Sequence, residues 1–414
     1  MNNNQEFYIH RFPNGLTLLC QRMEGMQSAA MTIMIRSGSE SDPESKSGMA
    51  NILSDLVLRG AGSRDSRQLT DYLDSLGLQR SSSVSVHHMR LACVGLANYV
   101  LTAIPTYAEM VRQPHLPEVG FNAARELSLQ ALDSVEDEPR QKLMIRLKER
   151  YLPYPQNRNA MGERREIQSI TLQDAQADYA RRTAPDEAII AVAGNIEFPV
   201  VHDAVEQAFG DWQAPSPVTI EMRPPMSRNF HEVQDSEQTH IGLAWNSILE
   251  TDPEYYTVRL AMEALGGGMS SRLFTEVREK RGLCYSVWAG YSSLKGLGSI
   301  MGYAGTSNDR AQATLECFLN ELAKLSLGIT AAELERAKTG LKASTIMQGE
   351  STSARSGAIA YDHFMRGRIR TLDEIKAAID SVTLDRVNSY LAANPCGNYT
   401  IVTVGPKPLQ IPTT

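Results

Sequence analysis

The chain has 414 residues, 42% of them hydrophobic and 21% charged, so it is too long for one ordinary core and predicts two domains of about 200 residues each. Its formal net charge of −7 offers no cationic field to a phosphate backbone, which excludes nucleic acid as an expected partner. The N-terminus has no basic segment followed by an apolar stretch, and no apolar run is long enough for a membrane span, so we expect a cytoplasmic protein without a membrane partner.

The first half of the chain begins with two strands and a helix. The turn Pro13-Asn14-Gly15 precedes a predicted strand from Leu16 to Gln21, and Met31 to Ile35 forms a second strand. The predicted helix from Lys46 to Arg59 carries its apolar side chains on one face. This half therefore begins as a sheet that one face of a helix covers.

A proline-rich stretch separates the two halves. Residues 213–229 contain four prolines and little apolar periodicity, which is typical of an extended connector rather than a helix or a central strand. We therefore predict an N-terminal domain at 1–212, a linker at 213–229 and a C-terminal domain at 230–414.

The second half contains two helices ahead of a strand. Asp252-Pro253 predicts an N-cap, and the helix that follows runs to Leu265 before the glycine-rich turn Gly266, Gly267 and Gly268 ends it. A further helix is predicted from Arg272 to Arg281, and a strand begins at Tyr285 with Val287 and Ala289 on the same face as Tyr285.

The two halves follow one plan. Ser169-Ile170-Thr171-Leu172 opens an amphipathic segment that leads into a β-rich run ending in Gly194. Ser381-Val382-Thr383-Leu384, displaced by 212 residues, leads in the same way to Gly405. The predicted fold class is therefore α+β, with two homologous domains that each contain a mixed, mainly antiparallel sheet covered by helices on one side.

The usual catalytic motifs are absent from the sequence. None of the eight histidines lies three to five residues from another His or Cys, and there is no H-E-x-x-H, H-x-x-E-H, G-x-S-x-G or phosphate loop. Gly266, Gly267 and Gly268 lack the basic residue and the preceding strand of a phosphate site. We interpret them as a helix stop that allows a sharp turn.

One local pattern suggests binding of a ligand. Arg278 lies in the last turn of a predicted helix, and Tyr285 begins the next strand. An arginine fork and a tyrosine hydroxyl at such a junction can hold a peptide carbonyl or carboxylate. Charged neighbours such as Glu279 and Lys280 also fit a solvated helix face, so both interpretations stay open on pattern alone.

Together these segments resemble the inverted-motif zinc peptidases, the family of pitrilysin, insulysin and the mitochondrial processing peptidase. The resemblance spans about residues 6 to 405. Its landmarks are Asn14-Gly15-Leu16, Gly38-Ser39, Asp42-Pro43, Ser47-Gly48-Met49-Ala50, Arg59-Gly60, Leu265 to Leu273 and Val277 to Ser286. It implies two homologous domains that form half of a clamshell chamber.

The resemblance also shows which residues are missing. Where active members have H-x-x-E-H, this chain has Asn51, Ser54 and Asp55. The two glutamates that active members carry on a later helix match Ala124 and Ala131. Zinc hydrolysis needs three suitable ligands and a base, whereas one carboxylate and one amide make a weak site. We therefore expect a degenerate zinc site, with no metal bound by this chain.

The resemblance implies a division of labour between two chains. The arginine and tyrosine that bind substrate in the family match Arg278 and Tyr285, and the glycine-rich turn is retained as well. We therefore expect a non-catalytic, substrate-binding subunit of a heterodimeric zinc-dependent endopeptidase. Its partners would be a peptide substrate and a homologous subunit that supplies zinc and H-x-x-E-H.

Two alternatives remain open. The first is a peptide-binding or assembly protein with no role in hydrolysis, as in family relatives that became core subunits of respiratory complexes. The second is an enzyme with relocated chemistry, which is weaker because the sequence shows no other pair of nucleophile and base.

Overall fold

The computed structural model describes residues 6–213, 220–225 and 229–411. They form two compact units, which we call unit 1 and unit 2. Unit 1 is drawn from Met1–Ser134, Tyr154–Arg223 and Gln348–Ile369, and unit 2 from Val135–Pro153, Pro224–Met347 and Arg370–Thr414. Most of the predicted linker, 214–219 and 226–228, lies outside the described residues.

Unit 1 is built on a sheet that has six strands among the described residues, in the order β1-β2-β8-β3-β7-β6. The strands are β1 (Phe7–Arg11), β2 (Thr17–Arg22), β8 (Ile189–Gly194), β3 (Ser28–Ile35), β7 (Met89–Leu96) and β6 (Gln79–Val84). The pair β2 and β8 is parallel and the other pairs are antiparallel. A separate short hairpin joins β4 (Gly60–Ala61) to β5 (Arg64–Asp65). Every residue of β8 is buried, as expected of a central strand covered on both faces.

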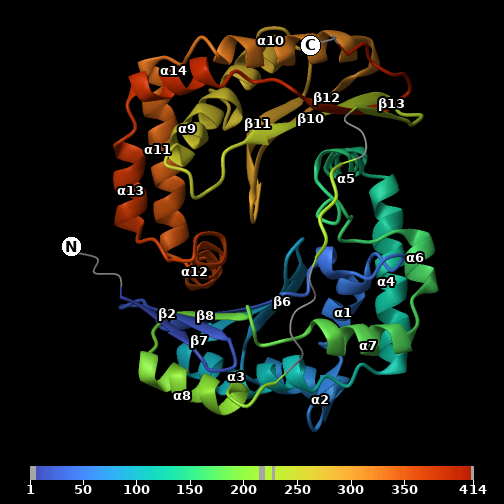
Figure 1. Cartoon of the computed structure of the whole chain (residues 1–414), viewed down its shortest axis with the longest axis vertical. Coiled ribbons are helices and arrows are strands. Elements are labelled where there is room, and N and C mark those ends of the chain that lie inside the picture. Colours follow the sequence, from blue (N-terminus) through green and yellow to red (C-terminus); the bar gives the residue numbers. More distant parts are fainter. Residues whose placement is uncertain (1–5, 214–219, 226–228, 412–414) are drawn as a thin grey trace. The chain divides into compact units, whose positions relative to one another are not determined.

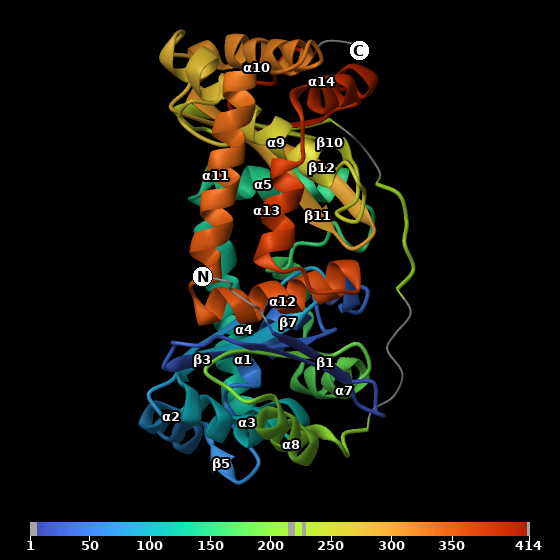
Figure 2. The ribbon, with the colours of Figure 1, turned by 90° about the vertical axis from the view of Figure 1, so that its left-hand side faces the viewer.

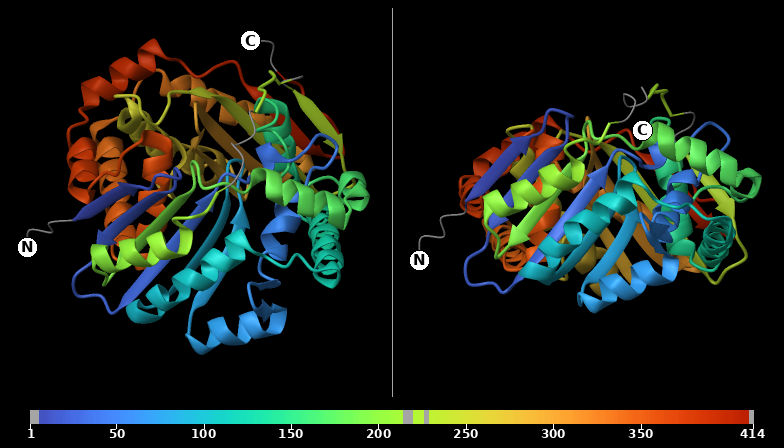
Figure 3. Two further views of the ribbon diagram at one scale, coloured as in Figure 1. Left: turned by 60° about the horizontal axis from the view of Figure 1, so that its bottom comes forward. Right: turned by 90° about the horizontal axis from the view of Figure 1, so that it is seen from below.

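Most helices of unit 1 pack on one face of this sheet, where α3 and α8 lie side by side (Figure 3). The helices are η1 (Ser39–Ser41, a 3₁₀ turn), α1 (Met49–Leu56), α2 (Ser66–Ser75), α3 (Ala97–Arg112), α4 (Glu118–Glu136), α6 (Arg164–Ser169), α7 (Leu172–Arg182) and α8 (Phe198–Phe209). The apolar face predicted for the first helix is buried in this core, with Ile52, Leu53 and Leu56 fully inaccessible.

The sheet of unit 2 has the strand order β11-β12-β10-β13-β9 within the described residues (Figure 1). Its strands are β9 (Phe230–Val233), β10 (Gln238–Ser247), β11 (Ser286–Leu294), β12 (Leu297–Ser307) and β13 (Thr400–Gly405). Only β13 and β9 pair in parallel among these strands. From β9 to β11, the strands of this sheet correspond one by one to β2-β8-β3-β7-β6 of unit 1. The parallel pair of β9 and β13 corresponds to the parallel pair of β2 and β8. The predicted pair of homologous, mainly antiparallel domains is therefore confirmed.

The longer helices of unit 2 come in the same order between the strands as those of unit 1, except that no helix of the described residues follows β13 as α8 follows β8. The helices of unit 2 are α9 (Tyr255–Gly266), the π-helix η2 (Phe274–Glu279), η3 (Asn308–Arg310, a 3₁₀ turn), α10 (Ala311–Leu325), α11 (Ala331–Gly349), α13 (Leu372–Asp380) and α14 (Leu384–Ala393). The repeated sequence motif has a local cause, because Thr171 and Thr383 accept hydrogen bonds from the backbone N–H groups of Asp174 (3.1 Å) and Arg386 (3.2 Å) and cap α7 and α14.

The predicted cap of the first helix in this half is wrong in detail. Asp252 accepts a hydrogen bond from the N–H of Glu254 at 2.7 Å, and the helix begins only at Tyr255, after Glu254. The aspartate therefore closes a local turn two residues before the cap, which is a competing use of an Asx side chain.

Each sheet carries one more helix on its other face, so the expectation of helices on one side only is wrong. In unit 1 this helix is α12 (Thr352–Arg366), which packs on β2, β3 and β8 (Figure 2). In unit 2 it is α5 (Pro139–Tyr151), which packs on β10 and β13 (Figure 1). Since α5 comes from the first half of the sequence and α12 from the second, the two units exchange equivalent helices across the predicted domain boundary.

None of the helices in the described ranges is both long enough and apolar enough to cross a membrane. The cysteines are free thiols, and all but the half-buried Cys396 are buried.

Candidate functional site

Helix α1 presents the three positions that match the missing zinc ligands and base. Asn51 Nδ2 donates a hydrogen bond to Ser128 Oγ on α4 at 3.2 Å, and Ser128 Oγ donates to the carbonyl of Ala124 at 3.0 Å. Helices α1 and α4 are therefore joined by a neutral hydrogen bond at the place where the resemblance puts metal ligands. Ala131, one turn further along α4 from Ser128, offers no donor atom for a metal.

The other two polar groups on α1 also have partners within the protein. Ser54 Oγ donates to the carbonyl of Asn51 at 2.9 Å, and the Asp55 carboxylate pairs with Arg59 Nε at 2.6 Å. Zinc requires three or four neutral imidazole, thiolate or carboxylate ligands around one point. One amide, one hydroxyl and one carboxylate neutralised by an arginine do not fit that requirement.

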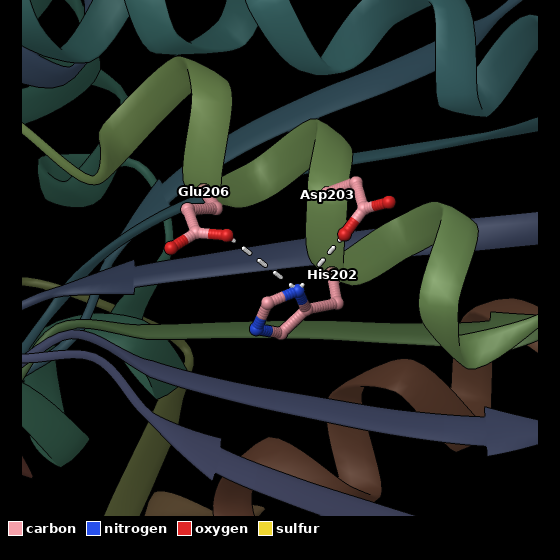
Figure 4. A group of neighbouring side chains, drawn as sticks. All are labelled: His202, Asp203 and Glu206. Carbon is pink, nitrogen blue, oxygen red and sulfur yellow. Dashed lines mark hydrogen bonds and ion pairs between the residues drawn. The ribbon is translucent and has the colours of Figure 1, made fainter.

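The described residues contain one group of three potential metal ligands, and it lies elsewhere in unit 1. On α8, His202 Nδ1 lies 3.2 Å from Asp203 Oδ1 and 3.9 Å from Glu206 Oε2 (Figure 4). Both carboxylates are exposed, and the His202 ring packs against His10 on β1. All three residues belong to α8, and exposed acidic side chains are common on a helix surface without any metal ion. We interpret the group as hydrogen-bonded side chains at the surface of α8.

The glycine-rich turn ends α9 as predicted, but for a different reason. None of its three glycines has a positive φ. A Cβ on Gly266 would lie 2.3 Å from the backbone nitrogen of Ala289 in β11, and a Cβ on Gly267 would lie 2.2 Å from the carboxyl carbon of Glu263. Close packing of α9 on the sheet therefore requires Gly266, whereas the group next to Gly267 is the end of the flexible Glu263 side chain on α9 itself. Gly268 has open space around it and lines a small cavity of about 200 Å³.

An ion pair fixes the segment that follows this turn. Arg272 donates to both carboxylate oxygens of Glu333, at 2.6 and 2.9 Å, and to the carbonyl of Gly328 at 2.8 Å. Burial on its own would raise the pKa of Glu333, but the hydrogen bonds from Arg272 and Thr330 lower it to about 2. The start of the arginine-bearing segment is thereby bound to the first turn of α11.

Arg278 lies in a π-helical turn rather than in the regular helix that the sequence predicts. The N–H of Lys280 donates to the carbonyl of Thr275 at 3.0 Å, five residues back. The guanidinium of Arg278 is exposed and lies 4.6 Å from the centre of the Phe274 ring. Nearby Glu276 pairs with Lys280 instead, and no carboxylate in the described part of the chain pairs with Arg278.

Tyr285 lies just before β11 and is 46% exposed. Its N–H donates to the carbonyl of Gly305 at 3.2 Å, and its hydroxyl donates to Gln238 Oε1. The prediction that Tyr285 lies on the same face of the strand as Val287 is wrong. Val287 packs with α9 and α10, whereas the Tyr285 hydroxyl contacts Gln238 and Tyr303, whose side chains lie on the sheet face that α5 covers.

The contacts of Tyr285 include residues that the sequence interpretation did not single out. The hydroxyl oxygens of Tyr285 and of Tyr303 on β12 both lie next to Gly305, and the Tyr303 hydroxyl is 2.9 Å from Nδ1 of His240 on β10. Tyr303 and His240 are almost completely buried. The one sequence signal for them is that each is a polar ring inside an apolar strand, where its polar atoms need a partner.

Two copies of one mixed sheet with exchanged helices define a two-domain protein with the architecture of the zinc peptidases. Comparison with known sequence families is consistent with this class. The family described as Insulinase (Peptidase family M16) matches residues 17–161, and the Peptidase M16 inactive domain matches residues 169–341. The chain belongs to the peptidase M16 family, as the sequence landmarks predicted.

Relatives of similar length align over nearly the whole chain. An uncharacterized zinc protease of Bacillus subtilis, YmxG, is 26% identical over 400 residues, covering 95% of this chain and 97% of the relative. A Streptomyces coelicolor protein with the same description is 26% identical over 390 residues, covering 91% and 84%.

Solved structures share the fold. The peptidase M16 inactive domain from Pseudomonas fluorescens has a TM-score of 0.89 and 22% identity, covering 99% of this chain and 100% of its own. A protease from Helicobacter pylori has a TM-score of 0.90 and 20% identity, covering 97% and 100%. A chain of Complex III2 from Candida albicans has a TM-score of 0.82 and 16% identity, covering 96% and 95%.

Proposed function

We propose that this chain is the non-catalytic, substrate-binding subunit of a two-chain zinc peptidase. Zinc and the catalytic base come from a homologous partner that carries H-x-x-E-H, and unit 2 of this chain binds the peptide through Arg278 and Tyr285. Peptidase-family membership, together with the zinc-protease descriptions of its relatives, supports the general class.

The observation that carries the proposal is the exposure of the Arg278 guanidinium and its lack of a carboxylate partner within the described part of the chain. The guanidinium is exposed and stacked on Phe274, and it has no carboxylate partner among the described residues although Glu276 and Glu279 are close in sequence. An unpaired arginine can donate two parallel, charge-assisted hydrogen bonds to a carboxylate or carbonyl. Tyr285, seven residues later, adds an exposed hydroxyl that can hold a peptide carbonyl or a developing oxyanion.

The positions on α1 support the division of labour between two chains. Asn51 is bonded to Ser128 and Asp55 to Arg59, so this chain offers no set of free ligands for zinc there. We expect the isolated chain to hold far less than one zinc per molecule by elemental mass spectrometry and to cleave no peptide. A mixture with the H-x-x-E-H partner should cleave peptides.

Substitutions in that mixture test the role of the pair. Loss of a charge-assisted hydrogen bond in Arg278→Ala is expected to lower kcat/KM about 10- to 100-fold, and Tyr285→Phe about 3- to 10-fold. Arg281→Ala, an exposed arginine three residues away, and Tyr99→Phe, an exposed tyrosine on α3, are the matched controls. Unchanged turnover in both test variants would show that unit 2 does not bind the substrate in this way.

The second candidate is an assembly subunit without a role in hydrolysis. Its specific support is the likeness in fold to a chain of Complex III2 from Candida albicans. Stable association with other chains, without gain in peptide hydrolysis on adding a zinc-bearing relative, would favour this candidate. A cytoplasmic location is part of either proposal, and cell fractionation with an antibody against this chain tests it.

A further inference from the structure

The cavity of about 200 Å³ beside the glycine-rich turn of unit 2 has residues of opposite charge in its wall. Its lining comes from the end of α9, from the segment after the turn and from the first two turns of α11, and we call it the turn cavity. Helices α9 and α11 lie side by side here (Figure 1), since a Cβ on Gly340 of α11 would lie 3.7 Å from Glu263 Oε1 of α9. Glu263 on α9 and Arg336 on α11 both line the turn cavity.

The Glu263 carboxylate occupies a position that is unfavourable for a negative charge. It belongs to the last turn of α9, where the backbone carbonyls without helical partners concentrate negative partial charge, and no basic residue lies in that turn. The side chain is half-buried, and no hydrogen bond or ion pair joins it to another residue in the described ranges. Since a partly buried charge is costly without a partner, a cationic group of a ligand would stabilise this carboxylate.

Gly267 leaves the space that the carboxylate occupies. A Cβ at this position would lie 2.2 Å from the carboxyl carbon of Glu263 and 2.3 and 2.4 Å from its two oxygens. The φ of Gly267 is −82°, so its backbone conformation does not require glycine. A methyl group here would move the carboxylate rather than the fold, because the carboxylate is the end of a flexible side chain.

Arg336 brings a positive charge to the same cavity. Its side chain is exposed, and it forms no hydrogen bond or ion pair with any residue that the structure describes, Glu263 included. Glu333, the other carboxylate of the cavity wall, is already bound by both donors of Arg272. A free carboxylate and a free guanidinium that line one cavity without pairing offer complementary contacts to a ligand that carries both charges.

The size of the turn cavity and its uncharged walls limit what such a ligand can be. Its volume is about 200 Å³, which corresponds to about seven water molecules at about 30 Å³ each. Ala264 and Ala337 give it buried apolar walls, and Met269, which is 76% exposed, lines its outer part. A single amino acid with an apolar side chain fits this space, whereas an extended peptide does not.

We propose that the turn cavity binds a free α-amino acid with an apolar side chain, whose ammonium group pairs with Glu263 and whose carboxylate pairs with Arg336. The guanidinium can donate two parallel hydrogen bonds to the carboxylate. The ammonium group supplies the positive charge that the chain does not place at the end of α9. Neither Arg278 nor Tyr285 lines the turn cavity, so this site does not depend on the proposed binding of peptide.

Calorimetric titration of the full chain with L-valine tests the site. We expect one valine per chain with a Kd of about 1 mM or tighter. Isobutylamine, which lacks the carboxylate, and 3-methylbutanoate, which lacks the ammonium group, should each bind at least about 10-fold more weakly, because each loses one charged pair. No binding of valine at about 20 mM would overturn the proposal.

Two further ligands separate a free amino acid from the N-terminus of a peptide. L-Valinamide and the dipeptide Val-Val keep the ammonium group but have an amide in place of the α-carboxylate. Both should bind at least about 10-fold more weakly than valine, because an amide gives Arg336 no negative charge to pair with. Binding of either as tight as that of valine would refute the pairing with Arg336 and show that the cavity takes a peptide N-terminus instead.

Single substitutions assign the two charges. Glu263→Gln and Arg336→Gln should each weaken valine binding at least about 10-fold. Glu263→Gln should unfold at the same urea concentration as the wild type or a higher one, because it removes a negative charge from the carboxyl end of a helix, so weaker binding would not reflect misfolding. Glu335→Gln is the matched control, since this exposed carboxylate precedes Arg336 on α11 and does not line the turn cavity. Full affinity for valine in either test variant would overturn the proposal.

A backbone variant tests the position of the carboxylate without removing any charge. Gly267→Ala displaces the Glu263 carboxylate and should weaken valine binding about 3- to 10-fold. Gly290→Ala, with open space around its Cβ in β11, is the control and should bind valine like the wild type. Unchanged affinity in Gly267→Ala would refute the contact between Glu263 and the ligand.

Discussion

The ion pair between Arg272 and Glu333 provides a quantitative test of how the glycine-rich turn is held. Both side chains are largely buried, with 18% and 13% of their surfaces exposed, and the contact is bidentate. We expect Glu333→Gln to destabilise unit 2 by about 3 kcal/mol at neutral pH, because it leaves a largely buried guanidinium without its counter-charge.

The magnitude and its pH dependence follow from the pKa of Glu333. Hydrogen bonds from Arg272 and Thr330 outweigh the effect of burial and lower this pKa from 4.5 to about 2. Each pKa unit corresponds to about 1.4 kcal/mol, so the ionised carboxylate contributes about 3 kcal/mol above its unfolded pKa. This contribution is lost as the pH falls from about 4.5 to about 2, because the unfolded state takes up the proton first.

The assay is urea unfolding followed by tryptophan fluorescence. Two of the three tryptophans, Trp245 and Trp288, lie in unit 2, so a Trp212→Phe background reports on unit 2 alone. The difference between wild type and Glu333→Gln should shrink steadily below pH 4.5. The control is Glu335→Gln on the same helix, whose carboxylate is exposed and 4.0 Å from Lys338, and it should change stability by less than about 0.5 kcal/mol. A difference that stays constant down to pH 2.5 would refute this account of the ion pair.

Two further substitutions test unit 1, with Trp212 fluorescence as the readout. Asp42→Asn is expected to destabilise unit 1 by about 3 kcal/mol. The reason is that the buried Asp42 carboxylate pairs with Arg182 at 3.1 Å and accepts hydrogen bonds from two backbone N–H groups at the start of α1. A loss of stability below about 1 kcal/mol would contradict this expectation. Asn51→Ala is expected to cost about 1 to 2 kcal/mol through its hydrogen bond to Ser128, and Ser128→Ala should cost little more once Asn51 is gone.

Local pattern predicted much of the fold. Strands β2 and β3, helix α1 and the two amphipathic segments that open at Ser169 and Ser381 depend on nearby residues, and the structure has each of them within a few positions. The exchange of α5 and α12 could not be predicted in this way. An apolar helix face shows that a helix is buried but not which of two similar sheets it covers.

The candidate site shows the same limit. The positions of Arg278 and Tyr285 at a helix-to-strand junction follow from sequence spacing, but the π-helical turn and the orientation of the Tyr285 side chain do not. Tyr303 and His240 come next to Tyr285 only through the register in which β12 pairs with β10. That register places His240 opposite Gly305, a pairing that no local spacing encodes.

The two units differ in how their polar side chains are used, and this difference separates structural from binding roles. In unit 1, Asn51 and Asp55 each have a partner in the protein, so their removal should cost stability and leave peptide binding unchanged. In unit 2, Arg278 has no polar partner among the described residues, so its removal should leave stability nearly unchanged and weaken peptide binding. Measuring unfolding and peptide affinity for Asn51→Ala and Arg278→Ala therefore gives opposite patterns if the division of labour holds. A loss of stability in Arg278→Ala comparable to that in Asn51→Ala would instead assign Arg278 a structural role.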